Sequence, residues 1–117
     1  MKREIKFRGQ RVDNGEWIYG MPTYDFMYLF NGEQLDSVDN YRIDPETIGQ
    51  FTGLLDKNGV DVYEGDVIAH KLFPNDVEIV KYKDGAFRVG QFLLSTYHCS
   101  VIKIMGNIHD NPELLEL

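Results

Sequence analysis

Residues 45–68, PETIGQFTGLLDKNGVDVYEGDVI, constrain the fold more tightly than any other stretch of this 117-residue chain. Apolar residues on both sides of Asn58-Gly59 indicate two strands, and an Asn-Gly pair favours the positive φ angles of a tight hairpin turn. A Glu-Gly-Asp triplet at 64–66 then interrupts the apolar pattern, which resumes at Val67. The segment therefore predicts a β-hairpin, a sharp bend at Gly65 and the start of a third strand.

The same segment resembles the core signature of the YopX family of phage and prophage proteins. Three short motifs carry the resemblance: DPETIGQFTGL at 44–54, DKNG at 56–59 and YEGD at 63–66. Two further motifs agree in order, because REIKFR at 3–8 looks like the family's N-terminal strand and GNIHDNPELL at 106–115 looks like its C-terminal signature.

The resemblance covers nearly the whole chain but is looser at 21–43 and 70–100. Leu55 also departs from the pattern, because it stands where the family often has a polar residue such as Lys. The resemblance implies a small, mainly β, phage-encoded protein with no activity that can be named. No catalytic residue is therefore carried over.

The fold class expected from the residues themselves is mainly β. Hydrophobic residues make up 43% of the chain and aromatic residues 13%, which suits one strand-rich core. We expect a single domain over 1–117, with an N-terminal hairpin region at 1–50, a barrel-like region at 51–110 and a C-terminal turn at 111–117. Closely spaced turns over 65–106 predict a small antiparallel barrel of the SH3 type, extended by the N-terminal hairpins.

Alternation and turn residues predict the individual elements. Strands are expected at 4–8, 16–19, 26–30, 41–43, 77–82, 87–89, 92–94 and 101–105. Hairpin turns are expected at Asn14-Gly15, Asn31-Gly32 and Asp84-Gly85. Asp44 before Pro45 predicts a short helical turn, a second such turn is expected at 113–117, and residues 70–76 predict a loop.

Charge is distributed unevenly along the chain. The formal net charge is −7, with +2 on residues 1–20, −8 on 21–66 and −1 on 67–117, so the middle of the chain repels nucleic acid. Cys99 is the single cysteine, which favours a reducing compartment. Because no apolar run approaches the ~18 residues of a membrane span and no signal-peptide pattern opens the chain, we expect an intracellular protein with no membrane contact. The family resemblance implies that this compartment is the cytoplasm of the bacterial host.

The basic N-terminal strand and its aromatic neighbours are the candidate nucleic-acid contact. Cations pair with phosphates and aromatic rings stack on unpaired bases, so such a combination fits a single strand. The candidate residues are Lys2, Arg3, Lys6, Arg8, Arg11, Trp17 and Tyr19. The same pattern also fits an ordinary strand whose aromatic side chains belong to the core.

Metal, cofactor and catalytic sites are not predicted. The soft metal ligands lack the short paired spacing of a zinc site; they are His70, His98, Cys99 and His109. The central carboxylates are explained by the turns that they flank; they are Asp56, Asp61, Glu64 and Asp66. No phosphate-loop, dinucleotide-binding or serine-hydrolase motif occurs.

Together with the phage origin that the resemblance implies, the residues favour a non-enzymatic accessory protein that acts through contacts with a host or phage protein, with self-association as a further option. A weak single-strand nucleic-acid-binding module is the first alternative. An acidic mimic of DNA that inhibits a host protein is the second, and it requires carboxylates arrayed at phosphate-like spacing. An enzyme ranks last.

Overall fold

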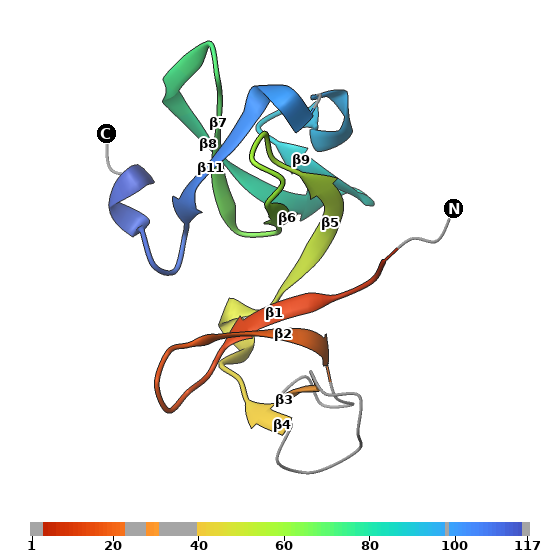
Figure 1. Cartoon of the computed structure of the whole chain (residues 1–117), viewed down its shortest axis with the longest axis vertical. Coiled ribbons are helices and arrows are strands. Elements are labelled where there is room, and N and C mark those ends of the chain that lie inside the picture. The colour runs from red at the N-terminus through yellow and green to blue at the C-terminus, as the bar shows by residue number, and fades with distance from the viewer. Residues whose placement is uncertain (1–3, 23–27, 31–39, 98, 116–117) are drawn as a thin grey trace. The chain divides into compact units, whose positions relative to one another are not determined.

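A computed structural model describes residues 4–22, 28–30, 40–97 and 99–115. The chain divides into two compact units, Met1–Phe51 and Thr52–Leu117. Strand β5 (Gly49–Leu55) carries the chain from the first unit into the second (Figure 1). Both units are built from antiparallel strands and short 3₁₀ turns, so the mainly β class is confirmed.

The first unit is arranged around its first strand, which pairs with β2 on one side and with β5 on the other. The strands follow the order β4-β3-β2-β1-β5. Their bounds are β1 (Phe7–Gln10), β2 (Trp17–Pro22), β3 (Tyr28–Phe30) and β4 (Asn40–Arg42). The predicted strand at 26–30 is thus confirmed at 28–30, whereas its first two residues and the Asn31-Gly32 turn lie outside the described residues.

The predicted helical turn after Asp44 is confirmed as the 3₁₀ helix η2 (Pro45–Thr47). The Asp44 carboxylate caps it by accepting the N–H of Glu46 at 3.1 Å, as an N-cap residue does. The buried Thr47 hydroxyl accepts the N–H of Gln10 at 2.8 Å and donates to the carbonyl of Asp44 at 2.6 Å. The turn is therefore bonded to β1 from within the first unit.

The second unit contains the β5–β6 hairpin and a five-stranded sheet of order β10-β9-β8-β7-β11. Its strands are β6 (Asp61–Tyr63), β7 (Asp66–His70), β8 (Phe73–Lys83), β9 (Ala86–Val89), β10 (Phe92–Leu93) and β11 (Ile102–Asn107). Its 3₁₀ turns are η3 (Leu94–Thr96), η4 (Cys99–Val101) and η5 (Pro112–Leu115). Residues 73–79 of β8 pair with β7, and residues 80–83 pair with β9. The long strand β8 therefore changes its pairing partner along its length.

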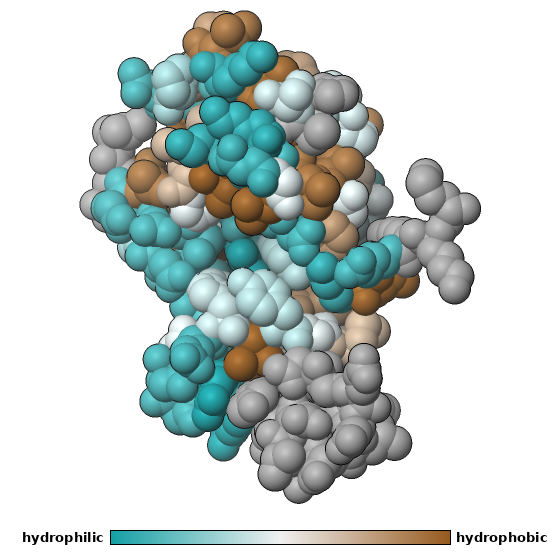
Figure 2. Space-filling view, in the orientation of Figure 1, coloured by the Kyte–Doolittle hydropathy of each residue, from teal (hydrophilic) through white to brown (hydrophobic). Residues whose placement is uncertain are grey.

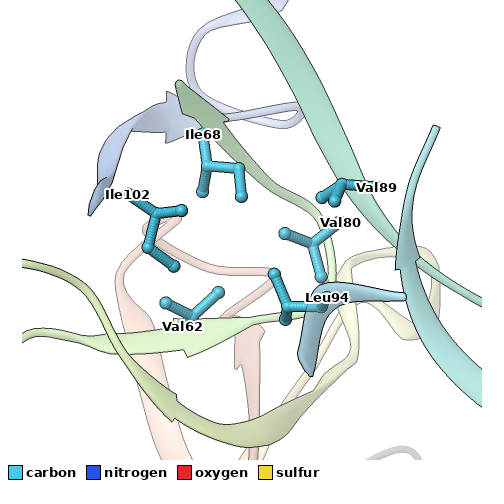
Figure 3. Packing of buried hydrophobic residues seen from close by; sticks show 6 residues of the cluster. All are labelled: Val62, Ile68, Val80, Val89, Leu94 and Ile102. Atoms are coloured by element: carbon cyan, nitrogen blue, oxygen red, sulfur yellow. The ribbon is translucent and has the colours of Figure 1, made fainter. Parts of the chain in front are cut away.

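The core of the second unit lies between the hairpin and the curled sheet. Six buried side chains point toward one another (Figure 3); they are Val62, Ile68, Val80, Val89, Leu94 and Ile102. The two edge strands of the sheet are β10 and β11, and among the described strands they do not pair with each other. The sheet is therefore not closed, and the predicted SH3-type barrel is not confirmed. The strand β10 is only two residues long before the chain enters η3.

The loop predicted at 70–76 is wrong except at residues 71–72, because β7 continues to His70 and β8 begins at Phe73. The pairing shifts from Ala69↔Val77 to His70↔Phe73, so residues 74–76 form an irregularity on β8. Pro74 lacks a backbone N–H and is tolerated at such a bulge. Turn chemistry here marked a bulge rather than the absence of a strand.

Other strand limits also differ from the prediction, including those of β1 and β11. The strand expected at 4–8 begins at Phe7. The strand expected to end before Gly106 continues to Asn107, with a register shift between Ile104 and Gly106. The glycine marks a bulge in β11 instead of its end, a use that glycine often has within strands.

The hairpin turns use positive φ in two ways. Asp84 (φ 54°) and Gly85 (φ 79°) both adopt it, as a two-residue turn requires. At 56–60 the positive φ is confined to Gly59 (φ 77°), because the loop between β5 and β6 is longer. Its backbone bonds are Asp56 N to Val60 O at 2.8 Å and Gly59 N to Asp56 O at 3.0 Å.

We predict that Gly65→Val destabilises the protein by roughly 1–3 kcal/mol, because Gly65 is buried with a φ of 94° that a β-branched residue adopts only under strain. Its N–H donates to Val80 O at 2.8 Å and its carbonyl accepts from Ile108 N at 3.0 Å, so the backbone cannot relax freely. Chemical denaturation measures the loss.

Gly59→Ala is the matched control. Gly59 also has positive φ, but a Cβ added there meets no atom within 4 Å, so we expect a loss of about 1 kcal/mol. Equal or reversed losses for the two variants would contradict the prediction.

Candidate functional site

The predicted nucleic-acid residues in the first unit are engaged with their own neighbours. The Lys6 ammonium pairs with Glu4 at 2.9 Å and lies 4.7 Å from the centre of the Phe51 ring. Arg11 donates from Nε to Asp13 at 2.9 Å, with a second hydrogen bond from Nη2. The hydrogen bond from Arg11 lowers the pKa of Asp13 below its ordinary value, so this acid stays ionised beside its cation.

The structure does bring Arg8 and Trp17 together. Arg8 is 6% exposed, and its guanidinium lies 4.5 Å from the centre of the Trp17 ring. Tyr19 is directly opposite Arg8 in the β1–β2 pairing and is 48% exposed. Lys2 and Arg3 lie outside the described residues. The cationic and aromatic side chains of this strand pair thus contact one another within the first unit.

The possible metal ligands that the structure describes do not gather into one group. Among the described residues, no group of three His, Cys, Asp or Glu side chains could hold a metal ion. His70 is in β7 and His109 is in the turn after β11, whereas His98 lies outside the described residues. In the part of the chain that the structure describes, no helix is long and apolar enough to cross a membrane.

The Asp56 carboxylate fastens the β5–β6 turn to β11. Asp56 is 4% exposed. Its Oδ1 accepts the backbone N–H groups of Asn58 at 2.8 Å and Val60 at 3.0 Å. Its Oδ2 accepts the N–H of Ile104, 48 residues away, at 3.2 Å. Beside it, the N–H of Lys57 donates to Ile102 O at 2.9 Å.

These donors also set the ionisation of Asp56. Burial alone raises its pKa, and this is the largest single effect. The N–H groups of Val60, Ile104 and Asn58 and the Lys57 charge act in the other direction and together lower the pKa below its ordinary value. Asp56 is therefore a buried structural carboxylate that remains charged.

The other signature residues are also explained by the fold. Asp66 is 2% exposed and its Oδ2 accepts the N–H of Tyr63 at 2.8 Å. After β11, Asn107 Oδ1 accepts the N–H groups of His109 at 3.0 Å and Asp110 at 2.9 Å. A Cβ at Gly106 would lie 2.5 Å from Asn111 Oδ1. The C-terminal turn therefore packs so closely against this position that only glycine fits.

A groove of about 460 Å³ in the second unit is the candidate functional site. Its floor is the core itself, at Ile68, Val89 and Ile102. Aromatic side chains from the β7–β8 hairpin and from β10 and the turn after it form its walls; they are His70, Phe73, Phe92 and Tyr97. The rim is completed by Asp76, Glu78, Gly90 and Gln91.

The aromatic rings of the groove contact one another but remain open to solvent. The ring centres of His70 and Tyr97 are 6.2 Å apart, and those of Phe92 and Tyr97 are 6.5 Å apart. Phe73 is 59% and Phe92 62% exposed. Figure 2 shows hydrophobic surface at the end of the β7–β8 hairpin, where Leu72 is 68% exposed. Exposed apolar surface that is this concentrated marks an interaction site more often than a solvated face.

Local structure places the polar groups of the groove. The irregularity at 74–76 of β8 carries Asp76 to the rim, since bulges redirect side chains. Glu78 lies against Gly90, where a Cβ would be 3.6 Å from its carboxylate. His70 Nδ1 accepts the N–H of Leu72 at 3.0 Å, so in the neutral imidazole Nε2 carries the proton and is a donor.

The groove is not predicted by the sequence. Its residues come from five strands and two turns, and most of them lie within 70–100, where the motif resemblance is loose. The available signal was weak: Phe73 precedes Pro74, and Phe92 follows Gly90-Gln91, so each aromatic residue stands beside turn chemistry. Large apolar side chains next to turns are common in cores, and their exposure could not be read from the pattern.

Comparisons with known proteins address the family and the fold. A family model described as YopX protein matches residues 6–116 of the chain. The chain is also similar to the crystal structure of protein EF1440 from Enterococcus faecalis, with a TM-score of 0.65 and 26% sequence identity. That similarity covers 97% of this chain and 99% of the other. No curated protein matches the chain. Neither description names an activity.

We predict that Asp56→Asn lowers the free energy of unfolding at pH 7 by about 2–3 kcal/mol, because a neutral amide replaces a charged acceptor and turns an NH₂ toward a backbone donor. Asp76→Asn, at an exposed position, is the control and should change stability by less than about 0.5 kcal/mol. Urea denaturation compares the two; a loss for Asp56→Asn no larger than that of the control would show that the carboxylate is dispensable.

The same carboxylate predicts a pH dependence. Because its pKa is lower in the folded protein than in the unfolded chain, its contribution is fully present above the unfolded-state pKa of about 3.9. That contribution is lost as the pH falls through the folded-state pKa. The stability difference between wild type and Asp56→Asn should therefore shrink below about pH 4. A difference that is constant from pH 7 to pH 2.5 would contradict this assignment.

We predict weak or absent binding to single-stranded nucleic acid and no measurable duplex binding near 0.15 M salt. Lys6 and Arg11 would have to leave their carboxylate partners, and five N-terminal cations at most allow a duplex salt slope of about −4.5. Fluorescence anisotropy with labelled single and double strands measures both. Submicromolar affinity for duplex DNA at that salt concentration would overturn the prediction.

Proposed function

This chain belongs to the YopX protein family, and we propose that it is a non-enzymatic protein-interaction module whose binding site is the groove of the second unit. We further propose a phage or prophage origin and a place in the cytoplasm of the bacterial host, as the family resemblance implies. In this reading the protein acts on a host or phage protein by occupying part of its surface.

The observation that carries the proposal is the exposure of aromatic side chains around an opening that reaches the core. Phe73 and Phe92 are more than half exposed, although the floor between them is formed by fully packed residues. Removing such rings from water on binding gives roughly 25 cal/mol per Å² of apolar surface. Aromatic residues also supply much of the binding energy in protein interfaces.

The fold gives this proposal a structural parallel. We propose an SH3-type arrangement for the second unit. Two features support it: the core is enclosed between a hairpin and a sheet, and the strand β8 pairs first with β7 and then with β9. Aromatic grooves on small β domains are a recurring way to bind extended peptides. This parallel concerns architecture only, and the proposed function depends on the groove.

The alternatives draw less support from the described geometry. A nucleic-acid interface on β1 and β2 would use cations that already contact Glu4, Asp13 and Trp17. A DNA mimic would depend on the carboxylates of residues 21–66, several of which lie outside the described residues. An enzyme would need a reacting group beside His70. The groove offers the carboxylates of Asp76 and Glu78 and the Tyr97 hydroxyl, and its described lining residues include no serine, threonine, cysteine or lysine.

Photo-crosslinking tests the proposal. With p-benzoylphenylalanine at position 92, we expect a discrete crosslinked partner in bacterial cells, and the crosslink should disappear when Phe73→Ser is added. The matched control places the same photoreactive residue at Tyr82, which is 54% exposed and lies outside the groove. Equal crosslinking from both positions, or crosslinks that survive Phe73→Ser, would refute binding through the groove.

A further inference from the structure

The rim of the groove carries two carboxylates that form no ion pair in the described structure. Asp76 and Glu78 both line the groove. Within the described ranges, no ion pair or hydrogen bond is formed by either side chain. A chain with a formal net charge of −7 also provides no general positive field to offset them. The rim therefore favours a cationic group on any ligand.

The aromatic walls suit the same kind of ligand. A Lys ammonium or an Arg guanidinium is attracted to the face of an aromatic ring, and the guanidinium also stacks on it. Phe73, Phe92 and Tyr97 offer three such rings beside the two carboxylates. The stem of a basic side chain is apolar and can pack along the rings while its head reaches the rim.

The apolar floor of the groove favours a ligand that has an apolar residue next to its cationic residue. Ile68, Val89 and Ile102 present core surface at the bottom of the opening, where a charged head could not be solvated. A groove of about 460 Å³ is large enough for more than one side chain, since ligand sites commonly span roughly 300–1,000 Å³. The protonated Nε2 of His70 can donate to a carbonyl of an extended backbone.

We propose that the groove binds an extended peptide segment in which a lysine or arginine adjoins an apolar residue. The apolar side chain occupies the floor over Ile68 and Ile102, and the basic side chain crosses the aromatic rings to pair with Asp76 and Glu78. This inference rests on the proposed function of the groove as a protein-binding site, and adds the chemistry of the segment that it recognises.

A displayed library of random 12-residue peptides tests the inference, with selection against wild type, Asp76→Asn/Glu78→Gln and Phe92→Ser. We expect peptides selected on wild type to be enriched in Lys or Arg beside an apolar residue. Their affinity should fall roughly 3- to 30-fold on the double carboxylate variant, the range expected for two exposed ion pairs. Raising the salt concentration from 0.02 to 0.3 M should weaken binding to wild type.

The controls separate this inference from the proposed function. Tyr82→Ser removes an exposed aromatic ring outside the groove and should leave binding unchanged. Peptides that need Phe92 but lack a basic residue, or that bind the double carboxylate variant equally well, would overturn the inference and leave the groove as a binding site. If no selected peptide depends on Phe92, both proposals are overturned.

A second copy of the chain is the competing occupant of the groove. Sedimentation of wild type and Phe92→Ser at several protein concentrations decides this point. We expect both to sediment alike. A wild-type dimer that Phe92→Ser converts to monomer would assign the groove to self-association and would overturn the peptide inference.

Discussion

A single buried carboxylate holds the second unit together across the longest stretch of its sequence. Asp56 orders its own turn through the N–H groups of Asn58 and Val60, and it reaches β11 through the N–H of Ile104. The β5–β6 hairpin carries Val62 into the core, whereas β11 carries Ile102. Without the carboxylate, these three part-buried backbone donors would lose their acceptor, and a donor left unsatisfied away from water costs about 1–3 kcal/mol.

The residues of the family signature therefore have structural roles in the fold. Asp44 caps η2, Gly65 supplies positive φ at a bend that β8 and the C-terminal turn both bond, and Asn107 caps the turn after β11. None of these roles leaves a side chain facing the groove. The groove is formed mainly by residues 70–97, outside the strongest motifs, so those motifs do not predict its chemistry.

Much of the local structure could be predicted because turn chemistry acts over a few residues. The Asp44-Pro45 helical turn, the Asp84-Gly85 hairpin and the bend at Gly65 each depend on a preference of the residue itself for a cap or a φ angle. The prediction failed where a residue had two uses. Pro74 and Gly106 indicated a loop and a strand end, and in the structure each stands in a bulged strand that pairing with β7 maintains.

The sequence by itself determined the β class and the turns at Asp44-Pro45, Gly65 and Asp84-Gly85, and it assigned the central carboxylates to the turns that they flank, since these follow from interactions between residues close in the chain. The tertiary structure alone decided that Asp56 reaches Ile104, that Lys6, Arg8 and Arg11 are engaged by neighbours, and that exposed rings meet two carboxylates in a groove. Exposure and charge pairing depend on which strands become neighbours, and strand order is set by the packing of the whole core.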